Sequence, residues 1–194
     1  MTKRRTILLA ALVAVLQIAF LGSMILGRAQ ALRAGREVTL NVEPVDPRDL
    51  LRGEYVRLGY DISQIPISLI ENASEAVDRA RDVLIYLRLA KNAGGSWAVK
   101  VAALNGPPTA PLTPDEIDIR GKVNYWPIAG NSETQVLVAY GIERFYLPEG
   151  AGRQIEENMR ERIFSVKLAV TSDGTAHIKQ LLDGDKVIFD EPLF

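Results

Sequence analysis

Two short apolar segments, VLIYLRL at residues 83–89 and WAVKVA at residues 97–102, decide the fold class. Both are rich in the aliphatic, β-branched and aromatic residues that favour strands. Between them lies Asn92-Ala93-Gly94-Gly95, which supplies the residue types of a tight turn. Two strand segments joined in this way predict a β-hairpin.

Further strand-like segments lie on both sides of this hairpin. They are found at residues 38–42, 55–62, 117–126 and 134–147, and a closing meander has turns at Asp173-Gly174 and Asp183-Gly184. A parallel α/β sheet would need a helix between successive strands, and the chain has too few helical segments for that. The sequence therefore predicts a mainly β (α+β) domain of about seven to nine short strands, arranged as a barrel or a sandwich.

One or two short helices complete the predicted domain. Ile155, Met159 and Ile163 recur at a spacing of four residues, which predicts an amphipathic helix over residues 154–162 that packs on a sheet. The polar segment 71–81, with Ser74 as a possible cap, is either a second short helix or a surface loop.

The N-terminus carries a long apolar run. Residues 7–26 contain no charge, and Gln17 and Ser23 are the polar members of the run. Twenty helical residues extend about 30 Å, which is the thickness of the hydrocarbon core of a bilayer. We therefore expect a basic tail at residues 1–6 and a transmembrane anchor at residues 7–27.

The alternative is a cleaved signal peptide, because Ala29-Gln30-Ala31 fits a cleavage site, and cleavage after Ala31 would give a secreted protein. Against cleavage, the apolar run is longer than a typical signal-peptide core, and Arg28 separates it from the site. We expect a single-pass protein of the inner membrane, with a solvated stem at residues 28–37 and a periplasmic domain at residues 38–194. Charge bias alone does not set this orientation, because basic residues flank the run on both sides.

Composition excludes several classes of function. With 194 residues, the chain has room for one globular domain beside the anchor. It has no cysteine and a single histidine, which excludes disulfides, thiolate sites and the usual zinc sets, so we expect neither metal nor cofactor. The net charge of −1 includes three cations ahead of the apolar run, so the domain lacks the basic excess of a nucleic-acid-binding protein.

The segment LRGEYVRLGY at residues 51–60 resembles the signature of the GDYXXLXY family of small membrane-anchored proteins. Gly53, Tyr55, Leu58 and Tyr60 match the signature, and Glu54 replaces its aspartate. Residues 44–50, 140–150 (which include Pro148, Glu149 and Gly150) and 191–194 are similar to family members as well. The family has no assigned activity, and its members are often encoded beside polytopic membrane proteins. The resemblance therefore implies a location and a type of partner.

Glu54 and Glu143 are the weak candidates for catalysis. Each would lie among apolar neighbours on one face of its predicted strand, and a buried carboxylate is costly unless it is paired or protonated. The nearby candidates for a partner are Arg48, Arg52 and Arg144. In one hypothesis the two glutamates act as general acid and base on a glycan. In the other, Glu54 binds backbone N–H groups at the start of its strand and Glu143 belongs to a structural ion pair.

Three functions follow from these observations. The first is a non-enzymatic, membrane-anchored extracytoplasmic domain that acts as partner or accessory subunit of a polytopic membrane protein. The alternatives are an envelope hydrolase that uses the two glutamates and a peptide- or polysaccharide-binding module. For the first function, the expected interaction surface combines Tyr55, Arg57 and Asp61 with the proline-rich loop at residues 107–114.

Overall fold

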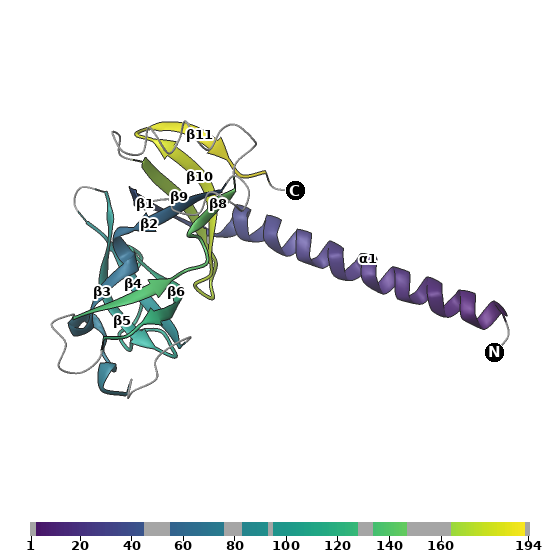
Figure 1. The fold of residues 1–194 in the computed structure, drawn as a ribbon, viewed down its shortest axis with the longest axis horizontal. Helices are drawn as coiled ribbons and strands as arrows, with labels where there is room; N and C mark the ends of the chain where they lie inside the picture. The colour runs from purple at the N-terminus through teal and green to yellow at the C-terminus, as the bar shows by residue number, and fades with distance from the viewer. Residues whose placement is uncertain are drawn as a thin grey trace.

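Eleven strands in two sheets follow one long helix in the part of the chain that the computed structural model describes, namely residues 3–44, 55–75, 83–92, 95–127, 134–146 and 164–192 (Figure 1). The elements are α1 (Lys3–Ala34), β1 (Arg36–Pro44), β2 (Tyr55–Tyr60), η1 (Asp61–Ser63), β3 (Gln64–Pro66), η2 (Ile67–Leu69), η3 (Ala73–Glu75), β4 (Leu84–Lys91), β5 (Trp97–Leu104), β6 (Glu116–Tyr125), β7 (Gln135–Ala139), β8 (Arg144–Tyr146), β9 (Phe164–Val170), β10 (Ala176–Asp183) and β11 (Lys186–Asp190).

The first sheet has the strand order β11-β10-β9-β1-β2-β8 and curls until its two edge strands meet. The ring centroids of Phe145 on β8 and Phe189 on β11 are 4.9 Å apart, and the rings are nearly perpendicular at 87°. Because these strands are at opposite ends of the sheet, this contact brings the sheet close to a barrel. Buried side chains at alternating positions of β1 and β9 fill its interior, among them Val38, Leu40 and Leu168.

The second sheet has five strands in the order β3-β7-β6-β4-β5, all antiparallel to their neighbours. The pair β4 and β5 at one end of this sheet is the hairpin predicted from residues 83–102. One hydrophobic core joins the two sheets, since Ile85 and Leu87 of this sheet belong to the same buried cluster as Val38 and Leu40 of the first. The two sheets therefore form one domain.

The predicted fold class, a mainly β domain behind an N-terminal apolar helix, is confirmed. The closing meander is present as β9, β10 and β11, and its turns contain Gly174 (φ 84°) and Gly184 (φ 59°), both in the left-handed region. Of the polar segment 71–81, Ala73–Glu75 forms the short 3-10 helix η3. The helix expected at residues 154–162 lies outside the described residues.

Helix α1 is long and apolar enough to cross a membrane, and the large apolar side chains of residues 7–26 are exposed, as for Ile18 (70%) and Phe20 (65%). Its end is not a separate stem, which corrects the expectation for residues 28–37. Residues 28–34 are the last turns of α1, and β1 begins at Arg36. The basic residues Arg28 and Arg33 are exposed, as the prediction of a solvated stem requires. Ala29 and Leu32, which lie between them in the sequence, are buried against the domain.

The helix is seated directly on the barrel. A Cβ atom at Gly35 would lie 2.7 Å from the carbonyl oxygen of Ala31 and 3.0 Å from the Cβ of Ala169 on β9, so the close approach requires glycine. Next to this contact, the guanidinium of Arg28 pairs with the carboxylate of Glu191. Figure 1 shows α1 projecting from the domain as an unbroken rod.

Candidate functional site

Two segments, residues 55–66 and 135–146, each pass from one sheet to the other. The first runs from β2 through η1 to β3, and the second runs from β7 through a turn at residues 140–143 to β8. They are antiparallel neighbours in both sheets, with Val56 opposite Phe145 and Ile65 opposite Val136. The register is the same on either side of the crossing, so neither segment gains a residue relative to the other.

A reciprocal pair of hydrogen bonds joins the two segments at the point where they cross. The hydroxyl of Tyr60 donates to the carbonyl oxygen of Ile142 at 2.6 Å, and the hydroxyl of Tyr140 donates to the carbonyl oxygen of Ile62 at 2.5 Å. Each tyrosine thus binds the isoleucine that follows the other tyrosine by two positions, which gives the crossing a local two-fold arrangement. We call Tyr60, Tyr140 and these two carbonyl groups the tyrosine crossing.

Both phenols are buried, with exposed fractions of 2% for Tyr60 and 7% for Tyr140. Burial raises the pKa of each phenol above its ordinary value, and the negative charge of Glu143 raises both further. Both hydroxyls are therefore protonated donors at neutral pH. Tyr60 is the last tyrosine of the motif at residues 51–60, so the motif ends on the residue that ties the sheets together.

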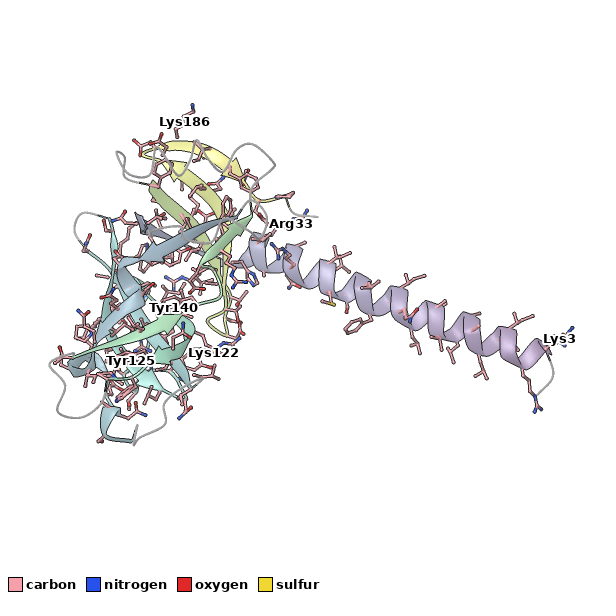
Figure 2. The ribbon with its side chains drawn as sticks, viewed as in Figure 1. Lys3, Arg33, Lys122, Tyr125, Tyr140 and Lys186 are labelled. Carbon is pink, nitrogen blue, oxygen red and sulfur yellow. The ribbon has the colours of Figure 1, made fainter. Side chains whose placement is uncertain are left out.

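Tyr140 packs across β6 at a position without a side chain. A Cβ atom at Gly121 would lie 3.0 Å from Cδ1 of the Tyr140 ring and 2.5 Å from Cγ1 of Val138. Glycine at this position therefore makes room for the ring against the sheet. In Figure 2, Tyr140 is labelled in the region where the two sheets meet.

Glu143 stabilises the turn of the second segment. One carboxylate oxygen accepts the N–H of Gly141 at 3.0 Å, and the other accepts the N–H of Tyr140. The main-chain oxygen of Glu143 accepts the N–H of Leu58 at 2.9 Å, which links the turn to the motif strand. Both carboxylate oxygens are thus engaged by backbone donors, which is a structural use of the group.

The strand expected over residues 134–147 is therefore wrong as a single element. It breaks at residues 140–143, where Gly141 has φ 81°, and the two halves belong to different sheets. Glu143 accordingly does not share a strand face with Leu137, as the alternating pattern suggested. Continuous strand patterning hides such a break, because the hydrophobic period resumes on the other side of the turn.

The other predicted site residues are only partly described. Asp61 is exposed in η1, beside the tyrosine crossing. Tyr55 and Arg57 pair through their backbones with Tyr146 and Arg144 of β8. Outside the described residues lie Arg48, Arg52, Gly53, Glu54, Pro148, Glu149 and Gly150. Glu54 is one of these residues, so of the two glutamates the structure describes the geometry of Glu143.

The proline-rich loop at residues 107–114 is hydrogen-bonded to the five-stranded sheet. Tyr55 and Arg57, by contrast, lie in the other sheet. Arg88, 3% exposed on β4, holds Asp118 through two bonds of 2.8 and 2.9 Å and also donates to the carbonyl oxygen of Ala110 in the loop. The paired carboxylate of Asp118 raises the pKa of Arg88. These contacts fix the middle of the loop.

Two carboxylates fix the rest of this loop. Glu116 accepts Nζ of Lys100 at 2.6 Å and the N–H of Thr113 at 3.1 Å, and these bonds lower its pKa to about 2. Glu71 accepts both the N–H and the hydroxyl of Thr109 at 3.0 Å. The loop is therefore fixed to the domain by hydrogen bonds. Its large apolar side chain Leu112 is 48% exposed.

Among the residues described by the structure, no group of three histidine, aspartate or glutamate side chains is arranged to hold a metal ion. The feature that sequence reasoning missed is the tyrosine crossing. A signal for it exists, since Tyr60-Asp61-Ile62 and Tyr140-Gly141-Ile142 share the pattern Tyr-x-Ile and each lies at the end of a strand.

A family model described as GDYXXLXY protein matches residues 17–181, which includes the tyrosine crossing and half of the apolar helix. No curated protein matches the chain. No solved structure matches it either.

Proposed function

Because the chain belongs to the GDYXXLXY family, we propose that it is a membrane-anchored, non-enzymatic protein that acts as a partner or accessory subunit of a polytopic membrane protein in the cell envelope. Its helix α1 remains uncleaved in the inner membrane, and its β domain lies on the periplasmic side. The basic residues Lys3, Arg4 and Arg5 stay in the cytoplasm, as in a signal anchor.

The observation that carries this proposal is the direct junction between α1 and the barrel. Gly35 is the single residue between helix and strand, Leu32 is 1% exposed, and Arg28 pairs with Glu191. A domain fixed in this way stays next to the bilayer and presents a constant face to other proteins of the same membrane. Such confinement raises its effective concentration for membrane partners, whereas a soluble substrate gains nothing from it.

The use of Glu143 supports a function by contact. A general acid or base must exchange a proton with a substrate, so its oxygens need to be within reach of that substrate. Both oxygens of Glu143 instead accept backbone N–H groups of its own turn. The hydrolase hypothesis would require this carboxylate to leave the turn that it holds in place.

The test is chemical crosslinking of the full-length protein in native membranes, followed by identification of the captured proteins. We expect a polytopic membrane protein, and we expect Arg57→Glu on the motif strand to reduce its capture. The matched control is Lys186→Glu at the exposed start of β11, which is not part of the expected interaction surface and should leave capture unchanged.

Two results would overturn the proposal. One is a mature N-terminus at Leu32, which would mean that the helix is cleaved. The other is hydrolysis of an envelope glycan by the purified protein that is lost in both Glu54→Gln and Glu143→Gln while the variants keep the wild-type melting temperature.

A further inference from the structure

The amide of Gln17 lies at the centre of the apolar helix. Gln17 is midway between Arg5 and Arg28, the charged residues that bound the uncharged run. If this run spans a bilayer, as the proposed function requires, the amide lies about 15 Å from either face of the hydrocarbon core. The side chain is exposed on the helix, and within the described ranges it makes no hydrogen bond.

An amide group in hydrocarbon has no water to replace a missing partner. Polar side chains inside membranes accordingly face other helices and hydrogen-bond across them. Ser23, the other polar member of the run, shows the local solution, since its hydroxyl donates to the carbonyl oxygen of Phe20 at 2.7 Å. Gln17 has no such internal bond, so its partner has to come from a second helix.

The residues around Gln17 form a face suited to helix packing. Its members follow each other at intervals of four and three residues, which is the spacing of a packed helical seam: Ala10, Ala14, Gln17, Leu21 and Met24. Ala10 and Ala14 allow close approach of a second backbone. The domain does not cover this face, because its contacts with α1 begin at Arg28, about 16 Å further along the axis.

We propose that this face binds a second copy of the same chain, so that the protein forms a parallel dimer through α1. Two copies inserted with one topology place their Gln17 side chains at the same depth. An amide carries both a donor and an acceptor, so two identical amides facing each other across a two-fold axis satisfy one another. A second copy of this chain meets both conditions, equal depth and a group that both donates and accepts, through its own sequence. A helix of another protein would meet them only under a further assumption about its sequence. The inference rests on the membrane anchorage in the proposed function.

The chain has no cysteine, so single cysteines report helix proximity without background. Ala10→Cys and Met24→Cys lie on the Gln17 face. Leu8→Cys and Leu26→Cys lie two residues away at nearly the same depth, but a step of two residues turns about 200° around the helix. On oxidation in membranes, we expect disulfide-linked dimers from the first pair and little from the second.

Gln17 itself is tested in the Met24→Cys background. We expect Gln17→Leu to reduce the crosslinked fraction by roughly threefold to tenfold, and Gln17→Asn, which keeps the amide, to retain most of it. Equal crosslinking at all four cysteine positions, or no effect of Gln17→Leu, would overturn the dimer. Capture of a different membrane protein by Met24→Cys would also overturn it while leaving the proposed function intact. Alkaline extraction of the membranes, run in parallel, shows whether the chain is anchored at all.

Discussion

The two phenol hydroxyls of the tyrosine crossing each satisfy a carbonyl oxygen in the middle of the domain. Tyr60 and Tyr140 are buried, and so are Ile62 and Ile142, whose carbonyl oxygens accept the bonds. A buried carbonyl that loses its donor costs more than the net value of the bond, because water cannot replace the hydroxyl. The crossing is therefore sensitive to the loss of a single oxygen atom.

We expect Tyr60→Phe and Tyr140→Phe each to lower the free energy of unfolding by about 1–3 kcal/mol. Chemical denaturation of the domain, followed by circular dichroism, measures the change. The control is Tyr86→Phe on β4, whose half-buried ring makes no hydrogen bond to the described residues. A loss of equal size in Tyr86→Phe would mean that the hydroxyls of the crossing carry no special weight.

The raised pKa values of the same phenols predict alkaline instability. In the unfolded chain a tyrosine ionises near pH 10, whereas burial keeps Tyr60 and Tyr140 protonated in the folded domain. Below pH 10 neither state ionises, so stability is unaffected. Above pH 10 each phenol makes unfolding more favourable by about 1.4 kcal/mol per pH unit, and stability falls as pH rises.

Stability curves recorded between pH 9 and 12 test this. The slope of Tyr60→Phe should be smaller than that of the wild type by about 1.4 kcal/mol per pH unit, since one of the buried phenols is then gone. An identical slope in both proteins would show that the hydroxyl reaches water when the domain is folded.

At the scale of elements, sequence predicted well what depends on neighbours along the chain. The β4–β5 hairpin and the β9–β11 meander were predicted because strand residues and turn glycines lie next to each other. The crossing was missed, because whether Gly141 ends a strand or sends it into another sheet depends on β2, which is distant in sequence. The end of α1 was missed because the burial of Leu32 depends on contact with the barrel.

Two elements are held by carboxylates whose pKa values lie near 2. Asp173 binds the hydroxyls of Thr171 and Thr175 in the β9–β10 turn and faces Arg120 of β6 at 3.1 Å, and its pKa falls to about 2. Glu116 holds the proline-rich loop with a similar pKa. Both pKa values are below those of unfolded carboxyl groups, so this stabilisation is present above about pH 4 and is lost as pH falls towards 2.

Acid unfolding measures this contribution. We expect Asp173→Asn and Glu116→Gln to be less stable than the wild type at pH 7 and to lose less stability between pH 4.5 and 2. The control is Asp185→Asn in the exposed β10–β11 turn, which should follow the wild-type profile. If all four proteins keep parallel profiles, the two carboxylates do not govern acid stability.

At the scale of the whole molecule, the domain boundary falls inside the helix. Ala29 and Leu32 are covered by the barrel, so the last turns of α1 belong to the domain and the earlier turns do not. We expect a protein that begins at Arg28 to be more stable than one that begins at Arg36 by about 1.5–3 kcal/mol, the value of burying one leucine. Thermal denaturation of the two soluble forms measures the difference.

Leu32→Ala in the longer form is the internal check. It should bring the melting temperature of that form down towards the shorter one. If the two forms melt together, the helix end does not contribute to the stability of the domain.

The glycine junction at residue 35 also makes the helix and the barrel turn as one body. A residue inserted into α1 on the N-terminal side of Ala29 would rotate the barrel by about 100° around the helix axis and move it by about 1.5 Å along that axis. Seven inserted residues would return the barrel to within about 20° of its original orientation about the helix axis. Under the proposed function, a partner that binds one face of the barrel would therefore lose contact with that face after one insertion and regain it after seven. Under the proposed function, the rotation of the helix about its axis, rather than the length of a tether, then decides which face of the barrel the partner meets.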